Sequence, residues 1–284
     1  MAVRAHLSLT PAPADHGPVL HIATSHSISP RWIEIQTRHL REHIKVPFTT
    51  WASLPLIDAA HGASFDMVIE QKGPEAGKLN HLALEISQVA QDQDLLMFLS
   101  PDAFPIADPI PMIEDGLSRT RLIAVRRAEN GGDVQPYPCF CVTTVGAWRD
   151  LAGDWSDGYP WSALDGRRVT DLGGNLLRRL ELSHASWTAL SRSNPTRLDP
   201  LFFAIYEGVI YHHGAGEITR AHRVSAPGEL PIPPLPGVST AMRRLSRERR
   251  LMWERRVQRR FKRRSDKLYQ RIADGGSGWL AEVS

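Results

Sequence analysis

Short apolar runs separated by polar and proline-containing segments recur along most of the chain. The clearest run is Leu95–Leu99, which is bounded by Asp94 and by Ser100-Pro101-Asp102. A short apolar run between such breakers predicts a strand that is buried on both faces. The same pattern predicts further strands over residues 19–24, 47–51, 121–126, 139–144 and 202–212.

Segments with helical periodicity lie between these strands. Ser29 suits the N-cap and Pro30 the first turn of a helix. Two more helices are predicted over residues 79–89 and 173–182. Alternating strands and helices are typical of an α/β fold, so we expect a mostly parallel central sheet with helices on both faces. The inward stripe of the first helix would consist of Trp32, Ile35, His39 and Ile44.

The charge is divided unevenly between a body and a tail. The net charge is +3, but residues 243–271 carry a local charge of +11, which leaves −8 for the rest. The prolines of residues 227–236 predict a linker over 227–238. We therefore expect an α/β domain over residues 1–226, the linker, and a basic amphipathic C-terminal helix over 239–284.

Composition excludes two classes of protein. Hydrophobic residues make up 42% and charged residues 23%, as in an ordinary globular domain. No apolar run approaches the roughly 18 residues of a membrane-spanning helix, and the N-terminal segment lacks the apolar run of a secretory signal. Cys139 and Cys141 are too close along a predicted strand to form a disulfide readily. We expect a reduced, cytoplasmic protein rather than a membrane protein or a secreted disulfide scaffold.

Asp102 follows the predicted buried strand at the end where open α/β sheets bind ligands. A carboxylate fixed there can coordinate a divalent cation that neutralises a diphosphate, or it can simply begin a turn before Pro105. The segment LLMFLSPDAFPI resembles the strand and acidic motif of GT-A-fold glycosyltransferases, which usually reads Asp-x-Asp. Ser100 replaces the first acid here. The resemblance implies a donor site at Ser100 and Asp102 and leaves strict metal dependence open.

A second segment of this resemblance surrounds Asp171. The run Thr170-Asp171-Leu172-Gly173-Gly174-Asn175 looks like the acid-plus-diglycine segment on the acceptor side of GT-A enzymes. Two glycines permit close backbone approach, and the helix that follows presents free N–H groups. The resemblance implies that Asp171 deprotonates or holds the acceptor hydroxyl, with Gly173, Gly174 and Asn175 beside it. The alternative is a plain helix N-cap at Asp171 with a glycine turn.

Paired histidines end the last predicted strand. His212 and His213 resemble the C-terminal histidine that completes the metal and diphosphate site of many GT-A enzymes. Neutral imidazole suits Mn²⁺ as a ligand. Because consecutive strand residues point to opposite faces, one histidine, His212 in preference, would face the site and the other would lie behind it. The resemblance thus implies a divalent metal, Mn or Mg, at Asp102, His212 and His213.

Further donor contacts are expected at two places. Thr24, Ser25 and His26 end the first predicted strand and would lie against the nucleotide. Lys78 and Asn80 stand where GT-A enzymes commonly place a basic residue and an asparagine near the donor phosphate or base. A lysine at a helix start is unfavourable to the helix dipole, which favours a ligand role, although a solvated surface lysine is the alternative.

The loop around Asp154 and Trp155 combines acids, aromatics and glycines. Such a composition suits sugar recognition, because rings stack on the apolar faces of sugars while carboxylates bind hydroxyls. The alternative is a loop anchored by core tryptophans.

Together these motifs imply a glycosyltransferase that moves a sugar from a nucleotide-diphospho-sugar to an unidentified acceptor hydroxyl. A nucleotidyltransferase is one alternative, although the glycine-rich phosphate loop it would need near the first strand is missing. A nucleic-acid-binding protein acting through residues 243–271, or a sugar-binding module without activity, are others. The tail's apolar stripe either packs on the domain, docks on an anionic membrane surface at the inner face, or accompanies nucleic acid. That stripe consists of Trp253, Val257, Phe261, Leu268 and Ile272.

Overall fold

The computed structural model describes residues 17–26, 29–130, 132–162, 168–195, 202–214 and 262–284. The chain divides into two compact units, of which the first ends at Gly214 and the second spans Ala215–Val283. Over the described ranges, no helix combines the length and the apolar character needed to cross a bilayer.

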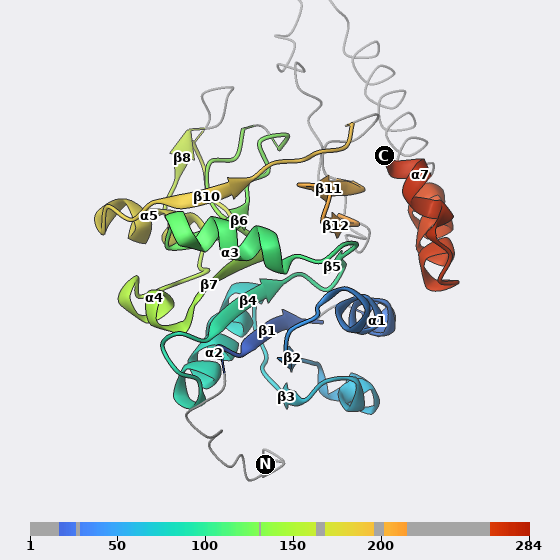
Figure 1. Cartoon of the computed structure of the whole chain (residues 1–284), viewed down its shortest axis with the longest axis horizontal. Helices are drawn as coiled ribbons and strands as arrows, with labels where there is room; N and C mark the ends of the chain where they lie inside the picture. Colours follow the sequence, from blue (N-terminus) through green and yellow to red (C-terminus); the bar gives the residue numbers. More distant parts are fainter. Residues whose placement is uncertain (1–16, 27–28, 131, 163–167, 196–201, 215–261) are drawn as a thin grey trace, which may run out of the picture. The chain divides into compact units, whose positions relative to one another are not determined.

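A seven-stranded sheet forms the centre of the first unit (Figure 1). Its strand order is β10-β6-β7-β4-β1-β2-β3, and every neighbouring pair is parallel except the two that involve β7. The predicted α/β class with a mostly parallel sheet is confirmed. The strands are β1 (Leu20–Ser25), β2 (Phe48–Ser53), β3 (Met67–Ile69), β4 (Leu95–Leu99), β6 (Leu122–Val125), β7 (Tyr137–Thr144) and β10 (Trp187–Leu190).

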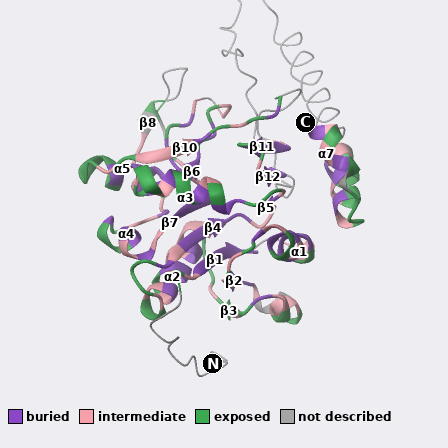
Figure 2. Ribbon diagram, in the orientation of Figure 1, coloured by how far each residue is buried: buried purple, intermediate pink, exposed green. Residues whose placement is uncertain are grey.

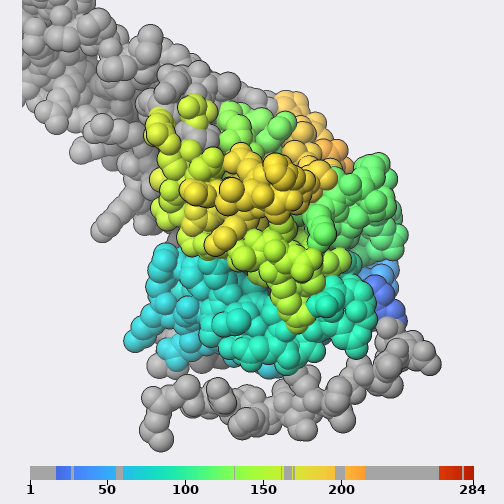
Figure 3. Space-filling view, turned by 90° about the vertical axis from the view of Figure 1, so that its left-hand side faces the viewer, coloured from blue at the N-terminus to red at the C-terminus, as the bar shows by residue number. Residues whose placement is uncertain are grey.

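Helices cover both faces of this sheet, because the central strands alternate between two apolar cores. In β4, Met97 and Leu99 join one core, while Leu96 and Phe98 join the other. Figure 2 shows the buried strands between helices with exposed outer faces, and Figure 3 shows the side formed by α2, α4 and α5. The first core is covered by α1 (Ile33–His43) and α3 (Ile110–Arg119), and the second by α2 (Glu75–Val89), α4 (Val145–Asp150) and α5 (Gly174–Leu182).

The first helix begins as the sequence predicts. Ser29 Oγ accepts a hydrogen bond from Arg31 N at 3.2 Å, and a 3-10 turn over Pro30–Trp32 leads into α1. All four residues of its expected inward stripe are buried. The helix predicted over residues 79–89 starts earlier, at Glu75, and Val89 is 53% exposed rather than inward.

A smaller sheet forms beside the end of β4. It consists of β11 (Ala204–Tyr206), β12 (Ile210–His212) and β5 (Ala103–Pro105), in the order β11-β12-β5, and its pairs are antiparallel. The single strand predicted over residues 202–212 is therefore wrong. Glu207 and Gly208 adopt φ angles of 50° and 69°, which turn the chain back on itself as a hairpin. A 3-10 segment (Leu56–Ser64) and the short pair β8 (Trp161–Ser162) and β9 (Arg168–Val169) complete the unit.

The second unit is described from residue 262 onward. Residues 262–273 are helical, and a 3-10 turn (Ser277–Trp279) and α7 (Leu280–Val283) follow. Leu268 and Ile272 of the predicted apolar stripe are buried, so this part of the stripe is packed. The predicted linker and the stripe residues Trp253, Val257 and Phe261 lie outside the described residues.

Candidate active site

The carboxyl ends of several strands meet at one edge of the large sheet. β1, β2, β4 and β6 run in the same direction, and β7 runs against them. His26 follows β1, Asp102 follows β4, Arg127 follows β6, and Tyr137 begins β7. These side chains therefore belong to the edge at which open α/β sheets bind ligands.

Asp102 and His212 face each other at this edge. The pairing of β12 with β5 sets His212 opposite Ala103, and Asp102 Oδ1 lies 3.5 Å from His212 Nε2. Burial alone would raise the pKa of Asp102, but the charge of His212 and a hydrogen bond to it outweigh burial and lower that pKa. Asp102 is thus an ionised carboxylate at neutral pH, held against an imidazole.

His213 occupies a different environment. Its ring is fully buried, with Nδ1 2.9 Å from Tyr211 Oη and the ring centroid 4.7 Å from that of Trp32. Burial lowers the pKa of His213 to about 3, so the ring is neutral. Its backbone N–H donates to the Asp102 carbonyl at 2.9 Å. The structure thus brings the His212 side chain to Asp102 and places the His213 side chain in the core.

Gln36, a residue that the sequence analysis missed, fixes the segment that carries Ser100 and Asp102. Gln36 Nε2 donates to the carbonyls of Ser100 and Ala103 at 2.7 and 2.9 Å. Gln36 Oε1 lies 3.1 Å from His26 Nε2. One buried amide therefore links α1, the end of β1 and the turn after β4.

The end of β1 presents buried polar groups. Thr24 and Ser25 are 1% and 2% exposed, and Thr24 Oγ1 lies 3.5 Å from His26 Nε2. Within the described part of the chain, the buried atoms His26 Nδ1 and, at the end of β2, Ser53 Oγ have no hydrogen-bond partner. Buried polar atoms are nearly always paired, so these two atoms leave hydrogen-bonding capacity at one sheet edge that a ligand could use.

Glu75 and Lys78 extend from the first turn of α2. Burial, together with the charges of Asp102 and Asp171, raises the pKa of Glu75 to about 7, against the opposing charges of His212 and Lys78. Lys78 is only 8% exposed, which argues against a solvated surface lysine, and burial lowers its pKa. The Glu75 carboxyl thus interacts electrostatically with Asp102 and Asp171, the two acids predicted for the site.

Arg127 holds Asp171 in place. Arg127 Nη2 lies 2.7 Å from Asp171 Oδ2 and 2.8 Å from Asp133 Oδ2, and the guanidinium stacks on Tyr137 at 3.5 Å. Leu172 N donates to Asp171 Oδ1 at 2.8 Å. The Asp171 side chain remains 40% exposed, so part of its carboxylate faces solvent.

The diglycine segment meets a requirement of the fold. Gly173, rather than Asp171, is the N-cap of α5, with a φ of 86°. A Cβ on Gly173 would lie 2.0 Å from Pro136 O. Gly174 N donates to Asp171 O at 3.1 Å. The close backbone approach expected from the glycines is therefore made by Gly173 toward Pro136.

Asp154 is the centre of a hydrogen-bonded cluster. It accepts from Asn80 Nδ2 at 2.7 Å and from Asn175 Nδ2 at 3.2 Å, so Asp154 contacts two other predicted site residues. Trp155 is fully buried, with its ring centroid 5.1 Å from that of Phe98. The indole therefore anchors the loop from the core and offers no exposed face on which a sugar could stack.

Asp102 and His212 suit a divalent ion in ligand type and in spacing. Adjacent ligands of a six-coordinate ion with bonds of about 2.1 Å lie about 3 Å apart. The two side-chain atoms lie 3.5 Å apart and need little adjustment. A carboxylate oxygen with an imidazole nitrogen is a donor set for Mn²⁺, and two protein ligands leave positions for phosphate oxygens and water.

Glu75, Arg127 and Tyr137 were also missed by the sequence analysis. Arg127 could have been found, because it directly follows a predicted strand at the edge that binds ligands. Glu75 was hidden because the predicted helix began at residue 79, which left Glu75 in a loop. No sequence signal pointed to Tyr137, whose role depends on stacking with Arg127.

Comparison with solved structures returns glycosyltransferases, the class that the sequence motifs resemble. A mannosyltransferase from Pyrobaculum calidifontis, in complex with GDP-Man and Mn²⁺, matches at 12% identity and a TM-score of 0.39, over 64% of this chain and 59% of its own. The glycosyltransferase GlyE of Streptococcus pneumoniae TIGR4 matches at 14% identity and a TM-score of 0.37, over 61% of this chain and 45% of the GlyE chain. TarS residues 1–349 of S. aureus match at 8% identity and a TM-score of 0.37, over 48% of this chain and 50% of the TarS chain.

This chain therefore spans about half the length of these structures. No family model and no curated protein sequence matches it. Because these TM-scores lie below 0.5, the function of this chain has to be inferred from its own side chains.

Proposed function

We propose that this protein is a glycosyltransferase that moves a sugar from a nucleotide-diphospho-sugar to an acceptor hydroxyl. The observation that carries the proposal is the Asp102–His212 pair at the carboxyl end of β4. A carboxylate and an imidazole in this position suit a divalent cation on a diphosphate, which is the part common to all such donors. The neighbouring groups Glu75, Lys78 and Asp171 supply the acid–base and cationic chemistry that sugar transfer needs.

The residues at the carboxyl ends of the parallel strands would bind the donor. Asp102 and His212 would hold Mn²⁺ or Mg²⁺, and the bound ion offsets the charge that develops on the leaving diphosphate. His213 would help to position Asp102 through the hydrogen bond from its backbone N–H to the Asp102 carbonyl. Lys78 adds positive charge on the phosphate side. Thr24, Ser25, His26 and Ser100 would lie against the nucleotide, and one contact would be His26 Nδ1, which has no partner among the described residues.

Two carboxylates are candidates for the base that activates the acceptor. Asp171 is partly exposed and oriented by Arg127, so it can receive or hold a hydroxyl. Glu75 has a pKa of about 7, and a general base works best when its pKa is near the working pH. We assign the role to Asp171 and keep Glu75 as the competing assignment.

The acceptor side would be shaped by Asp154, Gly173, Gly174 and Asn175. The bonds from Asn80 and Asn175 to Asp154 fix this loop against α2 and α5. Trp155 contributes by anchoring the loop in the core, rather than by stacking on a sugar.

The nucleic-acid alternative depends on residues 243–271, of which only 262–271 are described. Nothing among these described residues favours it, and burial of Leu268 and Ile272 is explained by packing.

Donor binding by the full-length protein tests the proposal. Nucleotide-diphospho-sugars are screened by thermal shift with Mn²⁺ and with EDTA, since a ligand that binds the folded state raises the melting temperature. We expect at least one donor to raise it, more with Mn²⁺ than with EDTA, and the metal-dependent part to vanish in Asp102→Asn. The matched control is Asp115→Asn, an exposed acid paired with Arg119 on α3. If no donor shifts the wild type under either condition, the proposal is wrong.

A further inference from the structure

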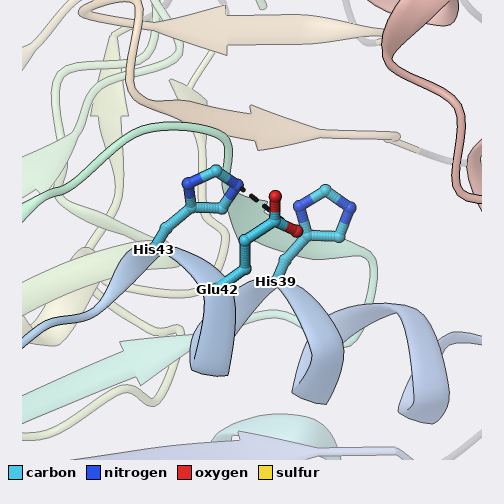
Figure 4. Close-up of side chains that lie close together, drawn as sticks. All are labelled: His39, Glu42 and His43. Atoms are coloured by element: carbon cyan, nitrogen blue, oxygen red, sulfur yellow. Dashed lines mark ion pairs between the residues drawn. The ribbon is translucent and has the colours of Figure 1, made fainter.

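The last turn of α1 carries a cluster of three metal-ligating side chains, away from the Asp102–His212 pair in sequence. His39, Glu42 and His43 stand at positions i, i+3 and i+4, which share one face of a helix. One potential ligand atom from each residue lies within 4.8 Å of the others. Figure 4 shows the Glu42 carboxylate between the two imidazole rings on the same side of the helix.

His39 has a buried nitrogen, Nδ1, for which the described residues supply no hydrogen-bond partner. The residue is 9% exposed. The ring also makes a hydrogen bond to the backbone of Pro105, which leaves that bond to the other nitrogen, Nε2. A metal-binding histidine typically gives its second nitrogen to a backbone carbonyl in this way, and the bond fixes both the tautomer and the ring orientation.

The other two side chains leave the cluster open to an ion from solvent. The Glu42 side chain is 61% exposed and that of His43 is 21% exposed, with 4.0 Å between His43 Nε2 and Glu42 Oε2. The rings of His39 and His43 stack with centroids 5.5 Å apart and planes at 23°. Ligands of a tetrahedral ion with bonds of about 2.1 Å lie about 3.4 Å apart, so small rotations of the exposed side chains suffice.

We propose that His39, Glu42 and His43 form a binding site for Zn²⁺ or a similar divalent transition metal, separate from the donor site. Two imidazole nitrogens and a carboxylate oxygen supply three ligands of a four-coordinate ion, and water supplies the fourth. The ion would fix the end of α1. Because His39 is bonded to Pro105 in β5, it would also stabilise the contact between α1 and the strand that follows Asp102.

Zinc titration of the full-length protein, with a competing chromogenic chelator and no nucleotide present, tests the site. We expect His43→Ala and Glu42→Gln, which change exposed side chains, to weaken one binding event about tenfold or more. The control His81→Ala removes a helical histidine that faces Glu85 at 3.8 Å without a second histidine, and it should bind as the wild type does. His212→Ala should also keep this site, which separates it from the donor site.

Cobalt provides a second measurement that does not depend on affinity. Co²⁺ bound to the wild type should show the intense visible absorption of a four-coordinate nitrogen and oxygen site, and this absorption should be lost in His43→Ala but kept in His212→Ala. Unchanged zinc affinity in both His43→Ala and Glu42→Gln, or loss of binding in His212→Ala alone, would overturn the proposal.

Discussion

His212 Nε2 lies 3.5 Å from Asp102 Oδ1, although the two residues come from segments far apart in the sequence. The contact depends on a hairpin, because the turn at Glu207 and Gly208 returns the chain so that β12 pairs with β5. β5 begins one residue after Asp102, and the register places His212 opposite Ala103. Backbone pairing thus sets the distance between the two ligands, and the chemistry of the side chains determines what can bind there.

His212→Ala and His213→Ala should have opposite consequences. Removing the His212 ring, which lies against Asp102 and is 7% exposed, should weaken Mn²⁺-supported donor binding about tenfold or more and cost less stability than removal of His213. Removing the buried His213 ring leaves a cavity beside Trp32 and removes the hydrogen bond between His213 Nδ1 and the Tyr211 hydroxyl, which should cost about 3 kcal/mol of unfolding free energy. Calorimetric donor titration and urea denaturation of both variants measure the two effects. Equal loss of donor affinity in two stably folded variants would show that both rings serve the metal.

Asp171→Asn should preserve donor binding and lower the transfer rate by about 10²-fold or more, the usual scale for loss of a general base. The substitution keeps the shape of the side chain but leaves one acceptor oxygen, so either the bond from Arg127 Nη2 or the bond from Leu172 N is lost. Turnover at saturating donor, with binding measured separately by calorimetry, distinguishes a chemical role from a positional one. If the variant turns over normally, Asp171 only orders the loop before α5.

Glu75→Gln should stabilise the metal-free protein at alkaline pH. The pKa of Glu75 is about 7 in the folded state against 4.5 in the reference state, so the folded state binds the proton more tightly between these values. Stability attributable to this carboxyl is therefore lost as pH rises from about 4.5 through 7. In EDTA at pH 8, the variant should gain about 3 kcal/mol over the wild type, and at pH 4.5 almost nothing.

Urea denaturation of Glu75→Gln and wild type at both pH values measures this difference, with Glu85→Gln on the exposed face of α2 as control. A sugar-transfer assay of the same variant also tests whether Glu75 is the catalytic base. If Glu75 rather than Asp171 is the base, Glu75→Gln loses about 10²-fold in turnover while Asp171→Asn does not.

Much of the fold could be predicted because it depends on local pattern. Leu95–Leu99 coincides with β4, and Ser29 caps the turn that leads into α1. The hairpin of β11 and β12 was read as one strand, because a single glycine, Gly208, is its only strong turn signal. Elements such as α3, with Gly116 packed against Ile123, depend on tertiary contacts that no local pattern specifies.

The candidate site was less predictable, because its decisive features are long-range. Asp102 could be singled out from its place after a buried strand, and His212 from its position at the end of the last predicted strand. The carboxylate of Glu75 and the Arg127 link between Asp133 and Asp171 depend on which loops the fold brings together. Composition alone was misleading at Trp155. The loop around it has the residue types that suit sugar recognition, but the Trp155 side chain is buried in the core.

His26 should make the protein sensitive to acid. The pKa of His26 is lowered by burial to about 4 in the folded state, below 6.5 in the reference state. Between these values the unfolded chain binds the proton and the folded chain does not, so stability is complete above pH 6.5 and falls as pH decreases toward 4. From pH 7.5 to pH 5, this residue should account for a loss of about 2 kcal/mol. His26→Gln, compared with wild type by urea denaturation at both pH values, should lack that part of the loss, and parallel profiles would contradict this origin.

Gly173→Ala should destabilise the protein strongly for two local reasons. The residue adopts a φ of 86°, which a side chain disfavours, and a Cβ there would lie 2.0 Å from the Pro136 carbonyl oxygen. The Gly173 backbone cannot move away from Pro136 without a cost, because Gly173 N also donates to Trp155 O at 3.2 Å. The left-handed conformation alone costs about 1–2 kcal/mol for a residue with a Cβ, and the clash adds to it. We expect a total loss of about 3 kcal/mol or more, measured by urea denaturation. Gly276→Ala is the matched control, since a Cβ at Gly276 meets nothing within 4 Å. If Gly173→Ala is as stable as the wild type but loses sugar transfer, the glycine is required by a bound acceptor rather than by the approach to Pro136.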